Sequence, residues 1–227
     1  MPTPPADQRN IPSHHSPLAL VVDASGSPIQ IGLPSAHGWI RLETDPSQAM
    51  QGIFHLVHKL FDGAPLSLKQ VSQIYFCEGP GSTLGLRLAA AFVKTLIWQR
   101  GDSVQLFQYN ALDLAMLMPT SPPPSLQAPF RRGRRFVRLS TGENPFIGEK
   151  KIMEEEDAIR EYPQSLHIPD QRGSNLVIPS SSTLAYDLQK IKGLEDLQKV
   201  SLSAEQPLPY SPEPMTFKKW EPSLKFG

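Results

Sequence analysis

The feature of this sequence that most constrains its fold is a glycine-rich turn, residues 79–85, between two apolar runs. Residues 74–77 precede the turn and predict a buried strand. Residues 86–99 follow it, are rich in alanine and leucine, and predict a helix. Ser82 stands where its hydroxyl group would cap that helix. A strand, a tight turn and a long helix in this order predict part of an α/β domain.

Two interpretations of the glycine-rich turn remain open. In the first, the free amides at the start of the helix cradle a phosphate or another anion. In the second, the glycines only permit a tight turn and close packing of the helix. The turn lacks both the Gly-Lys-Ser/Thr of a phosphate loop and the spacing of a dinucleotide site. An anion here would meet Gly79, Pro80, Gly81, Ser82, Gly85 and Arg87.

The helix predicted after the turn has more apolar surface than one sheet can cover. At 100° per residue its apolar side chains span roughly 200°, whereas a helix on one side of a sheet needs only about 100°. A second amphipathic helix is expected over residues 46–61, opened by Asp45 and Pro46. The surplus could meet another helix of the same chain or a different protein. The residues predicted to contact a partner are Met50, Phe54, Val57, Leu86, Ala90, Val93 and Ile97.

The remaining elements of the first half predict a layered α/β domain. Short apolar runs at residues 18–22, 29–33 and 38–43 predict three strands with tight connections. Residues 104–107 predict another strand, and Asn110 is expected to cap the helix that follows. The order of three strands and then alternating helices and strands implies a mixed sheet.

Composition sets the expected domain organisation. The chain has 227 residues, no net charge, one cysteine and 24 prolines, which gather in tails and linkers. No apolar run is long enough to cross a membrane and the N-terminus lacks a signal core, so a cytoplasmic protein without disulfides is expected. The predicted parts are a disordered proline-rich tail (1–17), an N-terminal domain (18–118), a linker (119–129), a reduced second lobe (130–217) and a tail (218–227).

No catalytic or metal site is predicted. His55 and His58 lie one helical turn apart, but no third ligand stands at a matching spacing. Cys77 and Ser82 have no assignable histidine partner that would make either a nucleophile.

The glycine-rich turn resembles a family signature. Residues 79–87 are similar to the Gly-Pro-Gly-Ser-Phe-Thr-Gly-Leu/Val-Arg motif of the TsaB (YeaZ) family, with Thr83 and Leu84 in place of Phe-Thr. Glu78 precedes the motif where an arginine is common. The resemblance covers about residues 18–118. These departures from the motif indicate a divergent member of the family.

The resemblance implies a fold and a role. TsaB proteins have a ribonuclease H-like, actin-like (ASKHA) domain with a smaller second lobe. They are non-catalytic subunits of the bacterial machinery that makes threonylcarbamoyladenosine in tRNA. The expected partners are a TsaD-type catalytic subunit, a TsaE-type ATPase and, indirectly, tRNA, with self-association through the same helices as a further expectation. No cofactor is expected, except a nucleotide with magnesium at a partner interface.

The resemblance also bears on Asp23, which closes the first predicted strand. In actin-like folds an acidic residue at this place lies beside the nucleotide and its metal. The alternative is an aspartate that caps turn amides. The chain could otherwise be a stand-alone nucleotide-binding protein of the actin-like or sugar-kinase type.

An arginine-rich run gives a third hypothesis, a tRNA-binding module. Residues 130–138 hold five arginines and two phenylalanines. Arginine binds phosphate and phenylalanine stacks on bases. The candidate contacts are Arg131, Arg132, Arg134 and Arg135. The alternative is that these arginines pair with the acidic run at residues 154–157.

Overall fold

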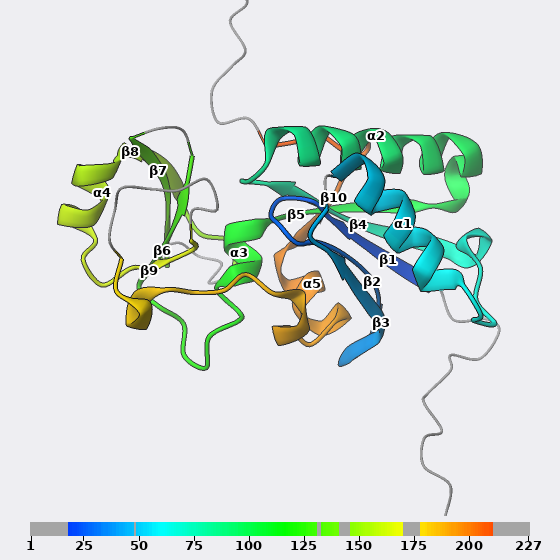
Figure 1. Ribbon diagram of the computed structural model, residues 1–227, viewed down its shortest axis with the longest axis horizontal. Helices are drawn as coiled ribbons and strands as arrows, with labels where there is room; N and C mark the ends of the chain where they lie inside the picture. Colours follow the sequence, from blue (N-terminus) through cyan, green and yellow to red (C-terminus); the bar gives the residue numbers. More distant parts are fainter. Residues whose placement is uncertain (1–17, 48, 131–132, 141–145, 170–177, 211–227) are drawn as a thin grey trace, which may run out of the picture.

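The structure of the chain is a computed structural model. It describes residues 18–47, 49–130, 133–140, 146–169 and 178–210 (Figure 1). The predicted tails, residues 1–17 and 218–227, lie outside the described residues.

A six-stranded mixed sheet forms the larger lobe, with the strand order β10-β5-β4-β1-β2-β3. Three central strands, β1, β4 and β5, run parallel, and the outer strands pair antiparallel. The strands are β1 (Leu18–Asp23), β2 (Ile29–Ser35), β3 (Gly38–Asp45), β4 (Val71–Gly79), β5 (Gln105–Asn110) and β10 (Ser201–Ser203).

Helices cover both faces of this sheet, because the residues of β1 alternate between two apolar cores. Leu20 and Val22 join the core under α1 (Ala49–Phe61) and α2 (Thr83–Arg100). Ala19 and Val21 join the core under α3 (Ala111–Ala115) and α5 (Leu194–Val200). Figure 1 shows α1 and α2 side by side on one face of the sheet and α5 on the other.

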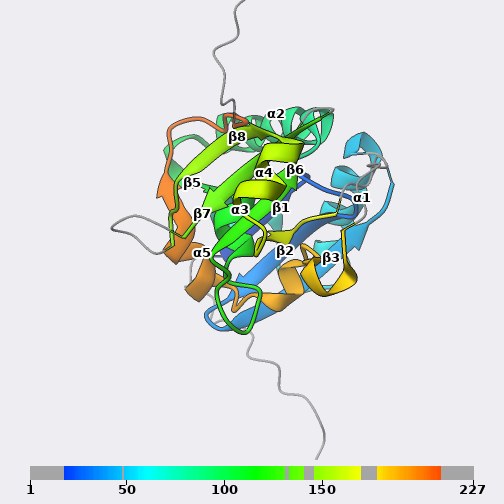
Figure 2. The ribbon, with the colours of Figure 1, turned by 90° about the vertical axis from the view of Figure 1, so that its left-hand side faces the viewer.

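The smaller lobe is a four-stranded sheet inserted between α3 and α5, in the order β8-β7-β6-β9. Figure 2 shows α4 lying over it, on the side away from the larger lobe. On the other side, Leu112 and Ala115 of α3 share a core with Leu126 and Phe136. Its elements are β6 (Ser125–Pro129), β7 (Arg134–Leu139), β8 (Lys150–Glu154), α4 (Glu155–Glu161) and β9 (Leu166–His167).

The mixed sheet with a reduced second lobe confirms the predicted fold class, but two predicted boundaries are wrong. Residues 119–129, expected as a linker, contain β6, which is paired with β7 and β9. Residues 130–217 were expected to form a separate second lobe, but they also contain α5 and β10, which belong to the larger lobe. The larger lobe is therefore assembled from both ends of the chain.

Local signals for turns and caps are confirmed. Ser82 accepts a hydrogen bond from the Gly85 amide, and Asn110 accepts one from Leu112. Ser67 forms a capping box at η1 (Leu68–Gln70). Three further 3₁₀ turns are η2 (Gly101–Ser103), η3 (Ser180–Ser182) and η4 (Leu188–Lys190).

The start of α1 differs from the prediction. The helix begins at Ala49 rather than at Pro46, because Asp45 ends strand β3. Its carboxylate accepts from the Ser47 amide (2.7 Å) and closes the turn before the helix.

Candidate functional site

The glycine-rich turn packs the start of α2 directly against the turn after β1. A Cβ atom on Gly81 would clash with the backbone of Ser25, and one on Gly85 would clash with the Ala24 carbonyl oxygen. The Ser82 amide donates to the Ser25 carbonyl oxygen at 2.6 Å. Two of the amides that would cradle an anion, those of Ser82 and Gly85, already have partners within the chain. The geometry therefore favours close packing over anion binding, and Arg87 points to solvent on the exposed side of α2.

Asp23 is buried and fully hydrogen-bonded within the chain. Its Oδ1 accepts from the Ser25 amide (2.9 Å) and hydroxyl (2.6 Å). Its Oδ2 accepts from the hydroxyl groups of Tyr109 (2.8 Å) and Tyr186 (2.6 Å). Burial and the nearby Asp23 charge raise the pKa of both tyrosines, so each stays protonated and can donate. Four donors occupy the lone pairs that a metal or nucleotide would need, so the capping interpretation accounts for Asp23.

The arginines of β7 alternate between the two faces of the smaller sheet. Arg135 is 1% exposed and forms an ion pair with Glu155 of α4 at 3.0 Å. Arg134 pairs with Glu154 at 3.3 Å and lies 5.9 Å from the Phe130 ring centroid. The prediction that Arg135 contacts tRNA is therefore wrong, and the alternative of pairing with residues 154–157 is confirmed for Arg134 and Arg135. Arg131 and Arg132 lie outside the described residues.

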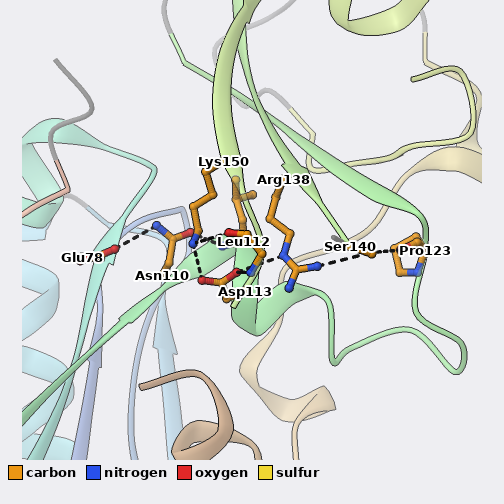
Figure 3. A network of polar contacts seen from close by, with 9 residues as sticks. Glu78, Asn110, Leu112, Asp113, Pro123, Arg138, Ser140 and Lys150 are labelled. Atoms are coloured by element: carbon orange, nitrogen blue, oxygen red, sulfur yellow. Dashed lines mark hydrogen bonds and ion pairs between the residues drawn. The ribbon is translucent and has the colours of Figure 1, made fainter. Parts of the chain in front are cut away.

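A polar network that the sequence did not predict joins the two lobes at Asp113 (Figure 3). Asp113, on α3, is 2% exposed, and its Oδ1 accepts from Arg138 Nε and the Gly148 amide, both at 3.1 Å. Its Oδ2 meets Lys150 Nζ at 2.6 Å. Arg138 and Lys150 come from β7 and β8, so one carboxylate of the larger lobe holds two cations of the smaller lobe.

Three of the predicted partner contacts are wrong. Leu86, Ala90 and Val93 are at most 9% exposed, because they face the sheet of their own chain. Val57 and Ile97 are partly buried against the same core. The sheet and α1 together therefore cover part of the apolar side chains of α2, including some that the sheet alone would leave exposed.

The outer side of the two helices nevertheless keeps large apolar side chains in solvent. Met50 and Phe54 on α1 are 63% and 64% exposed, and Leu84 and Trp98 on α2 are 65% and 85% exposed. The rings of Phe54 and Phe92 meet edge to face at 5.8 Å and make the two helices one surface. We call the set Met50, Phe54, Leu84, Leu88, Phe92 and Trp98 the helical surface.

The members of the helical surface lie on one side of each helix. On α2 they are residues 84, 88, 92 and 98, which at 100° per residue fall within an arc of roughly 120°, and on α1 they are residues 50 and 54. Leu84 and Trp98 were not among the predicted partner contacts, because the sequence of α2 does not show which part of its apolar arc the sheet covers.

Two negative findings concern the described part of the chain. No three His, Cys, Asp or Glu side chains within it gather as a metal site requires. The Nδ1 atom of His55 lies 2.9 Å from Oδ2 of Asp45, the residue that ends β3. None of the helices described there has the length and apolar character needed to traverse a bilayer.

Comparisons with known proteins show similarity in part of the sequence and in the fold. The family model described as TsaD, tRNA N6-adenosine threonylcarbamoyltransferase, matches residues 48–126. YeaZ from Pseudomonas aeruginosa superposes with a TM-score of 0.56 at 16% identity, over 86% of this chain and 100% of that one. A protein titled as uncharacterized, with similarity to peptidase YeaZ from the same organism, gives 0.58 at 16% identity, over 86% and 99%. No curated protein matches.

These matches show that the chain has the fold of YeaZ, as the resemblance predicted. The chain is TsaB-like in its architecture over the length of YeaZ, and divergent in sequence at 16% identity.

Proposed function

We propose that this chain is a TsaB-like, non-catalytic subunit that binds and activates a TsaD-type subunit during synthesis of threonylcarbamoyladenosine in tRNA. The observation that carries the proposal is the helical surface. Monomeric proteins rarely keep several large apolar side chains together in solvent, and such a patch marks a protein contact. Two adjacent helices with apolar side chains on their outer side suit helices of a partner rather than a peptide or a small molecule.

The TsaD match supports this choice of partner. Residues 48–126, which match the TsaD model, include both α1 and α2. A TsaD-type protein would then carry two corresponding helices. Two related subunits can place equivalent patches face to face about an approximate two-fold axis, as in an isologous dimer. The contact we propose is such a four-helix arrangement.

The region of Asp23 supports a non-catalytic role. The chain's own tyrosine and serine hydroxyl groups saturate the Asp23 carboxylate. The glycine-rich turn is closed against residues 24 and 25. A chain that fills this place with its own side chains would leave catalysis, and the nucleotide, to its partner. The TsaE-type ATPase and tRNA would meet the complex mainly through the TsaD-type subunit.

Size-exclusion chromatography with light scattering tests the proposal. The wild-type chain mixed with a TsaD-type protein from the same source should elute as a one-to-one complex. Phe54→Asp should weaken the complex by about thirtyfold or more, because a charge enters the centre of an apolar contact. The matched control is Leu208→Asp, since Leu208 is 62% exposed but lies far from both helices in sequence, on the irregular segment that follows β10.

Two outcomes would contradict the proposal. One is a mixture of the wild-type chain and the TsaD-type protein that elutes as two separate proteins. The other is a complex that Phe54→Asp and Leu208→Asp weaken equally, which would place the contact elsewhere.

A further inference from the structure

A cavity of about 220 Å³ lies between the two lobes, apart from the helical surface. It opens at the carboxyl ends of the parallel strands β4 and β5, the end of an α/β sheet where ligands commonly bind. Its polar side carries Glu78, Asn110 and Lys150, and its apolar side carries Ile147, Val200 and Leu202. Both lobes contribute to it, and neither the helical surface nor the Asp23 region uses it.

The cations next to this cavity are already engaged. Lys150 donates to the Asp113 carboxylate at 2.6 Å and to the Gly148 carbonyl oxygen at 3.2 Å. Arg138 donates to the other oxygen of Asp113. An anionic ligand would have to take one of these cations from a carboxylate that is 2% exposed, which is costly.

Glu78 differs from Asp113, because in the described part of the chain only neutral groups donate to it. Asn110 Nδ2 lies 3.1 Å from its Oε1, and Gln108 Nε2 lies 3.4 Å from its Oε2. Within the described residues no cation forms an ion pair with this carboxylate. Burial raises the pKa of Glu78 despite the nearby Lys150 charge, as expected for a desolvated carboxylate without a direct ionic partner.

We infer that the cavity between the lobes binds an aliphatic primary amine, with its ammonium group on Glu78 and its methylene groups along Val200 and Leu202. An ammonium group brings three donors and a full positive charge to a carboxylate whose donors among the described residues are two neutral amide groups. A chain of four or five methylene groups fits the volume of the cavity. The amine is either a free diamine or a lysine side chain of another protein.

Calorimetric titration of the full chain with 1,5-diaminopentane at neutral pH tests the inference. The diamine should bind saturably to the wild type. Glu78→Gln, which keeps the shape and removes the charge, should weaken this binding at least tenfold. Glu205→Gln is the matched control, because Glu205 is an exposed carboxylate that does not line the cavity, and it should bind as the wild type does. A thermal melt verifies that both variants are folded.

The uncharged analogue 1,5-pentanediol separates the role of the charge from the role of the apolar wall. It should show no binding to the wild type. Equal binding of the diol and the diamine would overturn the inference, as would diamine binding that Glu78→Gln leaves unchanged, or no diamine binding at all.

A further titration distinguishes the two sources of the amine. Nα-acetyl-lysine methylamide presents the same ammonium and methylene groups attached to a peptide unit. Binding within threefold of the diamine supports a lysine side chain as the occupant. Binding of the diamine alone supports a free small amine.

Discussion

At the scale of single residues, the glycines of the turn determine how closely α2 approaches the central strand. Gly81 and Gly85 face backbone atoms of residues 24 and 25, which cannot move aside as a flexible side chain can. The same contact places the Ser82 amide on the Ser25 carbonyl oxygen. A motif that resembles an anion site therefore serves here to bring the start of α2 into close contact with the turn after β1.

Gly81→Ala should therefore destabilise the fold. The added methyl group would overlap the Ser25 backbone, and overpacking of this kind lowers the free energy of unfolding by about 1–3 kcal/mol. Urea denaturation followed by circular dichroism measures the change. Gly26→Ala, in the neighbouring turn, meets nothing within 4 Å and should be close to neutral. Equal stability of the two variants would show that the close approach is not required.

His167 predicts a dependence of stability on pH. Burial and the nearby Arg135 charge lower the pKa of His167 from 6.5 to about 4, and Arg135 donates toward its Nδ1 at 3.4 Å. Between these two pKa values the unfolded chain binds more protons than the folded chain, so the free energy of unfolding falls as pH falls from about 6.5 to 4.

The His167 contribution over this range should be about 1–3 kcal/mol. Urea denaturation at a series of pH values measures it. His167→Gln should remove that part of the pH dependence, whereas the exposed His58→Gln should leave it unchanged. An identical pH profile for the wild type and His167→Gln would contradict the assignment.

At the scale of secondary-structure elements, the sequence predicted those parts that carry local signals. The strand at residues 74–77, the Ser82 cap and the Asn110 cap were all found at the expected places. They could be predicted because apolar runs and capping hydrogen bonds depend on residues close together in the chain.

Elements stabilised mainly by distant contacts were missed. The prolines and serines around residues 119–129 are typical of a linker, so β6 was not predicted there. This strand is stabilised by its pairing with β7 and β9, which bury most of its residues. The three residues of β10 form a strand only because β5 offers a free edge. The Asp113 network was also missed, since no spacing in the sequence relates that residue to Arg138 or Lys150.

The two leucines at the start of α2 test which side of the helix is covered. Leu86 is 4% exposed and Leu84 is 65% exposed. Leu86→Ala should lower the free energy of unfolding by about 2–4 kcal/mol, because it leaves a cavity against the sheet. Leu84→Ala should change it by less than about 0.5 kcal/mol. Guanidinium denaturation of the isolated chain compares them, and a large loss in Leu84→Ala would mean that the chain itself covers the helical surface.

At the scale of the whole molecule, contacts of two kinds join the lobes. Asp113 of the larger lobe pairs with cations of β7 and β8. The C-terminal segment also spans both lobes, since the Tyr210 amide donates to the Glu78 carbonyl oxygen at 2.7 Å and its ring lies 5.9 Å from Phe136.

Asp113→Ala should weaken this junction strongly. It would leave the buried Arg138 without its carboxylate, and removing one partner of a buried ion pair costs about 3–5 kcal/mol. Hydrogen exchange should show faster exchange in β7 and β8, with β1 and β4 less affected. The exposed control is Asp62→Ala. Unchanged protection of β7 and β8 would mean that the apolar contacts of α3 alone hold the lobes together.

The assembly of the larger sheet from both ends of the chain has a consequence for synthesis on the ribosome. A nascent chain that has emerged only as far as the smaller lobe exposes β5 as an open edge and leaves the apolar face under α5 uncovered. Open edges of this kind recruit other strands and promote aggregation. Translation must therefore pass residue 203 before the edge is closed by its own strand, so truncated products should be the chief substrates for chaperones and proteases.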